Sequence, residues 1–266
     1  MSRCAWIVSL TLLVACSLSG VVATAEEKED QGGLVIVEEV TLSPAGMQAY
    51  ETASKKLLPI LAEHDFPYAI DAYTTDDFHY LFVYPIKSFA DIDSLYESWT
   101  AFLKSWGMDK WEAMQEEIAG AVESTTMSVF RFRTGLSYLP DETAYDSSKS
   151  YYMYWGTCLV KPGMEHALEK SFRDFAELFT AKEVPSGWAT YQGYLGTEMP
   201  VYVYAEWGDS PAAFWTRAEK TQEKAGEAAE ALWNETMSTL RGYTYMTGRS
   251  RPDLSYKPAK PEAAQE

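Results

Sequence analysis

A ten-residue pattern occurs twice in this chain and constrains its fold more than any other sequence feature. Residues 131–140 and 249–258 both read R-x-R-x-x-L-S-Y-x-P, with six of ten positions identical. Arg249 follows Arg131 by 118 positions, and the other matched residues keep that offset. A spaced self-match at a fixed offset indicates an internal repeat. We therefore expect two copies of one structural unit in tandem.

The two halves of the chain share one order of expected elements. Runs of β-branched and aromatic residues predict strands, and apolar residues at helical spacing predict helices. The expected strands of the first half are 34–42, 67–73, 78–86 and 125–133, with helices after Ser43-Pro44 and over 88–123, broken near Gly107. Those of the second half are 151–160, 186–195, 201–207 and 240–249, with helices after Lys161-Pro162-Gly163 and over 210–239. Each half therefore reads β-α-β-β-α-β, the order of a ferredoxin-like unit.

The expected strands are apolar or aromatic on both alternating faces, which predicts burial on both faces. Packing one sheet against the other satisfies this requirement within one chain. We therefore expect an α+β fold in which two ferredoxin-like repeats pack their antiparallel sheets face to face as an intramolecular α+β barrel. The anchors that align the halves include Tyr73 with Tyr191, and Phe82 and Tyr84 with Tyr202 and Tyr204.

The expected division of the chain has six parts. They are a signal peptide at 1–25, a tether at 26–33, the first repeat at 34–140, a linker at 141–149, the second repeat at 150–256 and a disordered tail at 257–266. The signal peptide is predicted from Arg3 and the apolar run that follows it. Cleavage is expected after Ala25 or, at the lipobox-like Leu13-Val14-Ala15-Cys16, before a lipidated Cys16. Both alternatives export the protein from a bacterial cell, where it is periplasmic, secreted or lipid-anchored to the envelope.

The composition narrows the range of partners. A formal net charge of -17 argues against nucleic-acid binding, which needs clustered lysine and arginine, and against electrostatic attachment to anionic lipid. A lipid anchor is then the one expected contact with a membrane. Cys158 has no second cysteine for an internal disulfide after signal removal and is expected to be a buried hydrophobe. Because one polypeptide supplies both sheets, we expect a monomer with internal pseudo-two-fold symmetry.

The element order and the duplication resemble the dimeric α+β barrel superfamily, which includes the antibiotic-biosynthesis monooxygenase-like and stress-responsive barrel proteins. The resemblance covers residues 34–256 and rests on no catalytic motif, so it is informative about fold more than about activity. It implies a pocket that positions an electron-rich substrate for oxygen in the cofactor-independent monooxygenases. It also implies haem bound through a histidine in some branches, for which His79 is the candidate. The sequence requires no cofactor and leaves haem open.

Catalytic motifs give no assignment. The chain has no Gly-rich phosphate loop, no G-x-S-x-G, no H-E-x-x-H and no histidine pair at metal-ligand spacing. Strand aromatics could line a pocket or fill the core, and the repeated arginines could clamp an anionic ligand or pair with acidic helix residues. The candidate ligand-binding residues are His79, Tyr84, Arg131, Trp155, Tyr191, Tyr204 and Arg249.

Three functions stay open at this point. The first is an exported protein that binds a small, apolar or partly aromatic molecule, or a partner, through its barrel. The second is a cofactor-independent monooxygenase-like enzyme, and the third is a structural envelope protein. Whether the protein is an enzyme is left undecided, because no general base or nucleophile stands out in either half.

Overall fold

The computed structural model describes residues 31–259 and contains the expected order of elements. The first half comprises β1 (Gln31–Leu42), α2 (Met47–Glu63), β2 (Asp71–Thr75), β3 (His79–Ile86), α3 (Asp91–Trp106), α4 (Met108–Ile118) and β4 (Val122–Arg133). The second comprises β5 (Tyr152–Val160), α5 (Glu165–Ala181), β6 (Ala189–Leu195), β7 (Val201–Gly208), α6 (Pro211–Thr239) and β8 (Leu240–Ser250). The predicted signal peptide, Cys16, residues 26–30 of the tether and residues 260–266 of the tail lie outside the described residues.

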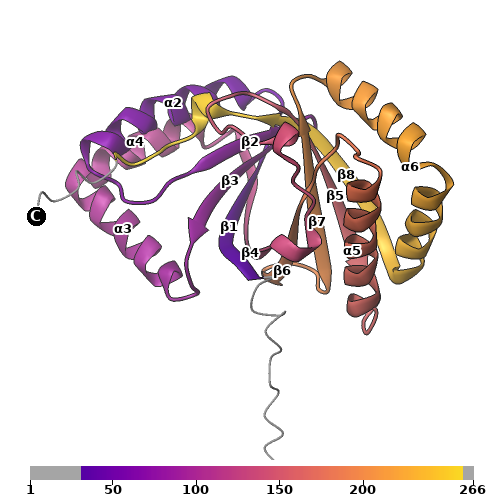
Figure 1. The fold of residues 1–266 in the computed structure, drawn as a ribbon. Coiled ribbons are helices and arrows are strands. Elements are labelled where there is room, and N and C mark those ends of the chain that lie inside the picture. The colour runs from indigo at the N-terminus through magenta and orange to yellow at the C-terminus, as the bar shows by residue number, and fades with distance from the viewer. Residues whose placement is uncertain (1–30, 260–266) are drawn as a thin grey trace, which may run out of the picture.

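All eight strands form one closed antiparallel barrel in the order β1-β3-β2-β8-β5-β7-β6-β4. Each half supplies four adjacent strands, and the two sheets are hydrogen-bonded to each other along both edges, where β2 pairs with β8 and β4 with β6. Helices α2, α3 and α4 cover the outside of the first sheet, and α5 and α6 cover the outside of the second (Figure 1). The expected α+β architecture of two ferredoxin-like repeats in an intramolecular barrel is confirmed.

The strand register corrects one part of the alignment between the halves. Tyr73 pairs with Leu81, eight positions on, whereas Tyr191 pairs with Val203, twelve positions on. The second hairpin therefore carries four more residues between the same two paired positions, and insertions are tolerated best in such loops. The predicted equivalence of Phe82 and Tyr84 with Tyr202 and Tyr204 is wrong by two residues. By strand register, Tyr80, Phe82 and Tyr84 of the first repeat are equivalent to Tyr202, Tyr204 and Glu206 of the second.

The repeated ten-residue pattern forms two arms that the halves exchange. We define the exchange arms as residues 133–138 and 251–256. The hydroxyl of Tyr256 donates to the Phe66 carbonyl at 2.9 Å in the first half, although the arm belongs to the second. Tyr138 likewise donates to the Val184 carbonyl at 3.1 Å in the opposite half. In each arm a leucine (Leu136 or Leu254) is buried completely or almost completely. Each arm therefore closes the core of the half to which it does not belong.

Polar contacts of the exchange arms repeat in the same symmetric way. Arg133 donates to Glu169 on α5 at 2.8 Å, and Arg251 donates to Glu51 on α2, with its Nη2 at 2.8 Å from Oε2. Glu169 follows Glu51 by the same 118 positions. Ser255 accepts a hydrogen bond from the backbone N–H of Ala72 at 2.9 Å. Because each arginine and its glutamate partner recur at the repeat distance, these contacts explain why the pattern occurs twice.

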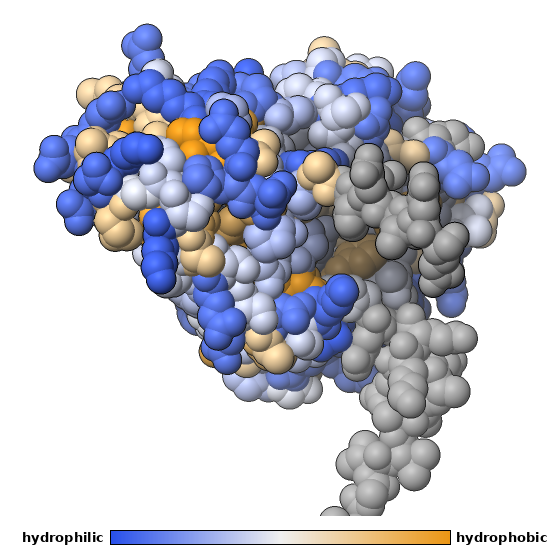
Figure 2. Space-filling view, turned by 90° about the vertical axis from the view of Figure 1, so that its left-hand side faces the viewer, coloured by the Kyte–Doolittle hydropathy of each residue, from blue (hydrophilic) through white to orange (hydrophobic). Residues whose placement is uncertain are grey.

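Barrel closure leads us to expect a monomer in solution. Each strand of the barrel has a hydrogen-bonded neighbour on both sides, so the closed sheet offers no edge to a second chain. Hydrophilic residues dominate the face over the first-half helices, with small apolar patches between them (Figure 2). We expect a monomeric mass by size-exclusion chromatography with light scattering at micromolar concentration. A dimer that persists on dilution would contradict this expectation.

Within residues 31–259, none of the helices combines the length and the apolar character that crossing a bilayer requires.

Candidate functional site

Alternate side chains of the second-half strands point into two different cavities. On β7, Val203 and Ala205 face the inside of the barrel, whereas Tyr204 and Glu206 face the helices α5 and α6. This division follows from the two-residue period of a strand. The inner cavity, which we call the barrel lumen, has a volume of about 670 Å3. The cavity between the second sheet and its helices, which we call the outer cleft, has a volume of about 610 Å3.

The outer cleft has aromatic walls and a break in one of the helices that bound it. Helix α5 contributes the rings of Phe172, Phe175 and Phe179, and α6 contributes the indole of Trp233. Helix α6 is interrupted at Gly226, which has φ 61° and ψ -150° and lines the cleft. Glycine reaches this backbone conformation without the steric penalty that other residues meet. The break lets α6 pass the cleft as two segments instead of one straight rod.

Three tyrosine hydroxyls meet on the outer face of the second sheet. The hydroxyl of Tyr243 lies 2.7 Å from that of Tyr204 and 2.8 Å from that of Tyr154. A Cβ at Gly156 would stand 2.3 Å from the Tyr204 ring, so the glycine makes room for this arrangement. Burial raises the pKa of Tyr204 and of Tyr154, which keeps both hydroxyls protonated. Of the three tyrosines, Tyr204 lines the outer cleft, so its hydroxyl oxygen can accept a hydrogen bond from a ligand.

A carboxylic acid lies beside this hydroxyl cluster. Glu206 lines the cleft two residues after Tyr204, and burial raises its pKa to about 7, while the charge of Arg217 opposes that shift. Arg217 itself donates to the backbone carbonyl of Trp207. A carboxyl group with a pKa near neutrality exchanges protons at physiological pH, which is the property that general acid–base catalysis needs. Glu206 is not among the residues predicted from the sequence, although an acidic residue on an otherwise aromatic strand face is a detectable signal.

The corresponding space in the first half is filled by aromatic side chains. Phe66 packs on Trp99 with ring centroids 4.5 Å apart, and Trp99 meets Phe102 at 5.6 Å. The hydroxyl of Tyr84 donates to Glu38 at 3.1 Å, and burial raises the pKa of Glu38. Both halves therefore hold a partly buried glutamate with a raised pKa on the outer face of the sheet. The cleft of the second half leaves its carboxyl group open to a small molecule, whereas Glu38 is engaged by Tyr84.

The four aromatic candidates from the sequence lie in three different places. Trp155 and Tyr191 line the barrel lumen, and Tyr204 lines the outer cleft. Tyr84 lies in the packed core between the first sheet and its helices. Strand alternation alone does not reveal which face of each strand is turned inward, so the sequence could not separate these groups.

The three charged or titratable candidates lie outside both cavities. His79 begins β3, and its Nδ1 is hydrogen-bonded to the carboxylate of Glu39. Arg131 places its guanidinium over the ring of Tyr194, 5.2 Å from the centroid. Arg249 lies on β8 between the backbones of β2 and β5.

The described residues do not fit haem in either cavity. In the part of the chain that the structure covers, no histidine lines the barrel lumen or the outer cleft. His79, the candidate ligand, contacts Glu39 instead. Over residues 31–259, no group of three or more His, Cys, Asp or Glu side chains is arranged to hold a metal ion.

Comparison with known proteins gives a likeness in fold. The chain matches no protein-family model and no curated protein. Among solved structures, an anthrone oxidase-like protein is 14% identical with a TM-score of 0.57, over 82% of this chain and 91% of that one. A candidate monooxygenase from Lactobacillus acidophilus is 8% identical with a TM-score of 0.52, over 85% and 97%. A chlorite dismutase variant from Candidatus Nitrospira defluvii is 10% identical with a TM-score of 0.50, over 85% and 94%. The chain shares the duplicated α+β barrel fold of these proteins.

Proposed function

We propose that this protein is an exported binding protein whose outer cleft takes a flat, electron-rich aromatic molecule that carries a hydroxyl or carbonyl group. The observation that carries the proposal is the combination of aromatic walls with one polar end, where the hydroxyls of Tyr154, Tyr204 and Tyr243 meet beside Glu206. The predicted signal peptide supports export.

The dimensions and chemistry of the outer cleft favour this class of ligand. Small-molecule pockets usually measure about 300–1,000 Å3, so a cleft of about 610 Å3 suits a molecule of two or three fused rings. Phe172, Phe179 and Trp233 offer ring faces and edges for stacking. Three glutamates, Glu206, Glu227 and Glu230, line the cleft and disfavour an anionic ligand. A neutral aromatic phenol or ketone can stack on these rings and carries no negative charge.

Titration with 1-naphthol tests the proposal through quenching of tryptophan fluorescence, since Trp188 and Trp233 line the cleft. We expect binding to the wild type, and at least a tenfold weaker affinity in Ala229→Phe, because the new ring fills the cleft. Tyr204→Phe removes one hydroxyl and is expected to weaken binding about fivefold, the effect of one hydrogen bond.

The matched control for this titration is Val203→Phe, which fills the barrel lumen from the neighbouring position on β7. Its affinity for 1-naphthol should equal that of the wild type. Absence of binding, or equal losses in Ala229→Phe and Val203→Phe, would refute the assignment to the outer cleft. Thermal unfolding of each variant checks that it is folded.

A second candidate function, cofactor-independent oxygenation, is favoured by Glu206. A carboxylate whose pKa is about 7 can take a proton from an activated C–H group at neutral pH. For anthrone as probe substrate, the CH2 carbon becomes a carbonyl, one oxygen atom of O2 enters the product, and the other leaves as water. The four electrons lost by the substrate carbon equal the four gained by O2, so no further reductant is needed. The likeness in fold to an anthrone oxidase-like protein and a candidate monooxygenase supports this second function.

A further inference from the structure

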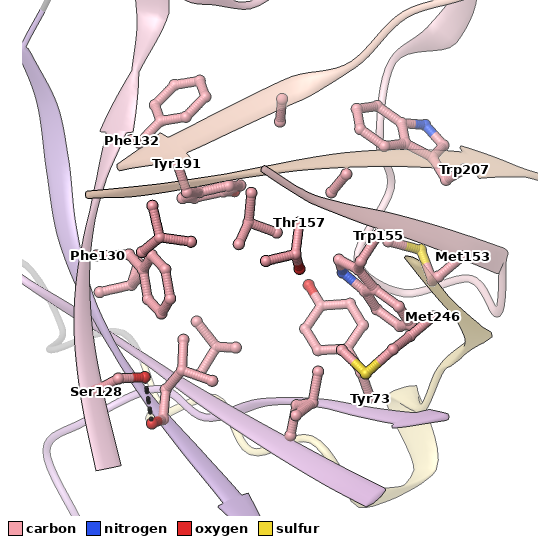
Figure 3. Close-up of a pocket in the computed structure, with 18 of the residues that line it drawn as sticks. Tyr73, Ser128, Phe130, Phe132, Met153, Trp155, Thr157, Tyr191, Trp207 and Met246 are labelled. Carbon is pink, nitrogen blue, oxygen red and sulfur yellow. Dashed lines mark hydrogen bonds between the residues drawn. The ribbon is translucent and has the colours of Figure 1, made fainter. Parts of the chain in front are cut away.

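The barrel lumen is open because small side chains line much of it. An eight-stranded barrel is just wide enough for its side chains to fill it or for one small ligand. Here many of the lining side chains are short, and a space of about 670 Å3 remains between the aromatic rings (Figure 3). The short side chains include Val35, Val37, Val83, Thr157, Val203 and Ala205.

Polar groups gather at one place inside this apolar space. The hydroxyls of Tyr73 and Thr157 and the indole N–H of Trp155 point toward the middle of the lumen (Figure 3). The Tyr73 and Trp155 rings meet edge to face at 5.8 Å, which holds the indole in place. Burial raises the pKa of Tyr73, and the neighbouring hydroxyl of Tyr145, to which Tyr73 is hydrogen-bonded, adds to the rise, so the Tyr73 hydroxyl stays neutral. An indole N–H can only donate, and hydroxyls can donate as well, so this place suits a hydrogen-bond acceptor.

Charged side chains stand only toward the two ends of the lumen. Among the described residues that line it, no lysine, arginine or histidine is present, and the carboxylates are Glu39, Asp141 and Glu198. An anionic ligand would lose its hydration without gaining an opposite charge. A cationic ligand placed at the hydrogen-bond donors would meet no carboxylate there, since the carboxylates lie toward the ends. The lumen therefore favours an uncharged molecule.

The two ends of the lumen are built differently. Tyr152 pairs with Gly208 and Leu159 with Val201, so the start of β5 and the start of β7 lie at opposite ends. The linker before β5 crosses one end, where the indole N–H of Trp207 donates to the Thr143 carbonyl at 2.9 Å. At the other end, residues 196–198 line the lumen and belong to the hairpin that is four residues longer than its counterpart in the first half. Both features that border the lumen therefore break the two-fold symmetry of the repeats.

We propose that the barrel lumen is a second ligand site, separate from the outer cleft, and that it binds a neutral apolar molecule with one carbonyl or ether oxygen. Tyr73, Trp155 and Thr157 donate to that oxygen, and the valine and aromatic side chains enclose the rest of the molecule. The wall of β7 separates the two sites, since Val203 and Ala205 face one and Tyr204 and Glu206 the other. The lumen site does not depend on the function proposed for the outer cleft.

The test uses 6-propionyl-2-dimethylaminonaphthalene, a neutral fluorescent ketone whose emission moves to longer wavelength when its carbonyl accepts a hydrogen bond. The titration is made in the Ala229→Phe background, where the outer cleft is filled, so that failure of the function proposed for that cleft does not affect the result. We expect saturable binding at one site per chain. Adding Val203→Phe should weaken binding at least tenfold.

Two conservative variants test the hydrogen-bond donors inside the lumen without filling it. Tyr73→Phe and Thr157→Val each remove one hydroxyl and are expected to weaken binding about threefold to tenfold, with emission of the bound probe at shorter wavelength. Unchanged affinity in Val203→Phe, or unchanged affinity and emission in both hydroxyl variants, overturns the assignment. No saturable binding in the Ala229→Phe background also overturns it.

Discussion

Replacing Tyr256 with alanine is expected to lower the free energy of unfolding by about 3–5 kcal/mol, the range for large aromatic truncations in a core. Tyr256 is 5% exposed, although it stands only ten residues from the end of the chain. Its ring packs against Phe66 at 6.1 Å, and its hydroxyl bonds to the carbonyl oxygen of Phe66. The variant therefore loses ring packing and leaves a buried carbonyl without its donor. Urea denaturation followed by circular dichroism measures the change.

Two controls separate the contributions to this effect. Tyr256→Phe keeps the ring and loses the hydroxyl, so we expect a loss of about 1–2 kcal/mol. Tyr96→Ala removes a tyrosine that is 55% exposed and should change stability by less than about 0.5 kcal/mol. A Tyr256→Ala variant within 1 kcal/mol of the wild type would show that the exchange arm does not hold the halves together. Tyr138→Ala, the equivalent change in the other arm, should resemble Tyr256→Ala.

The sequence predicts the architecture well because the architecture depends on repeated local patterns. Arg133, Leu136 and Tyr138 recur 118 positions later, and the glutamate pairing of the arginine and the carbonyl contact of the tyrosine recur with them, so one pattern reports on both arms. The helix break near Gly107 is confirmed, since α3 ends and α4 begins there with φ 117° at the glycine. Such features depend on residues that are close in sequence, or on residues that recur at one fixed sequence offset.

The site is harder to predict because it depends on which spaces side chains leave unfilled. The same sheet–helix gap is packed by Trp99 and Phe102 in the first half and open in the second, although both halves are rich in aromatic residues. Likewise, only the pairing of β3 with β1 and of β7 with β5 shows that Glu206 occupies the position equivalent to Tyr84. The second hairpin is four residues longer, so equivalent residues of β3 and β7 no longer lie 118 positions apart. A comparison of the two halves by sequence therefore does not align Tyr84 with Glu206.

Replacing Glu206 with glutamine is expected to stabilise the protein at alkaline pH and to abolish the proposed oxygenation. The pKa of Glu206 is raised from 4.5 to about 7 in the folded state, so the folded protein binds the proton more tightly than the unfolded chain. Wild-type stability must then fall as pH rises from about 4.5 to about 7 and stay at its lower value above that window. Glutamine carries no charge and avoids this loss. We expect Glu206→Gln to exceed the wild type by about 1–3 kcal/mol at pH 8 and to match it near pH 4.

Glu38→Gln is the matched control, since Glu38 is a buried carboxyl with a raised pKa in the packed half. It should show the same direction of change in stability with pH but leave oxygen uptake with the probe substrate unchanged. Glu206→Gln should lower that uptake at least a hundredfold, because an amide cannot take the proton. If Glu206→Gln retains uptake, Glu206 has no role as a base. If the wild type itself takes up no oxygen with the probe substrate, the protein only binds its ligand. A variant that gains stability and loses turnover at the same pH identifies Glu206 as a group held in a costly ionisation state for its chemistry.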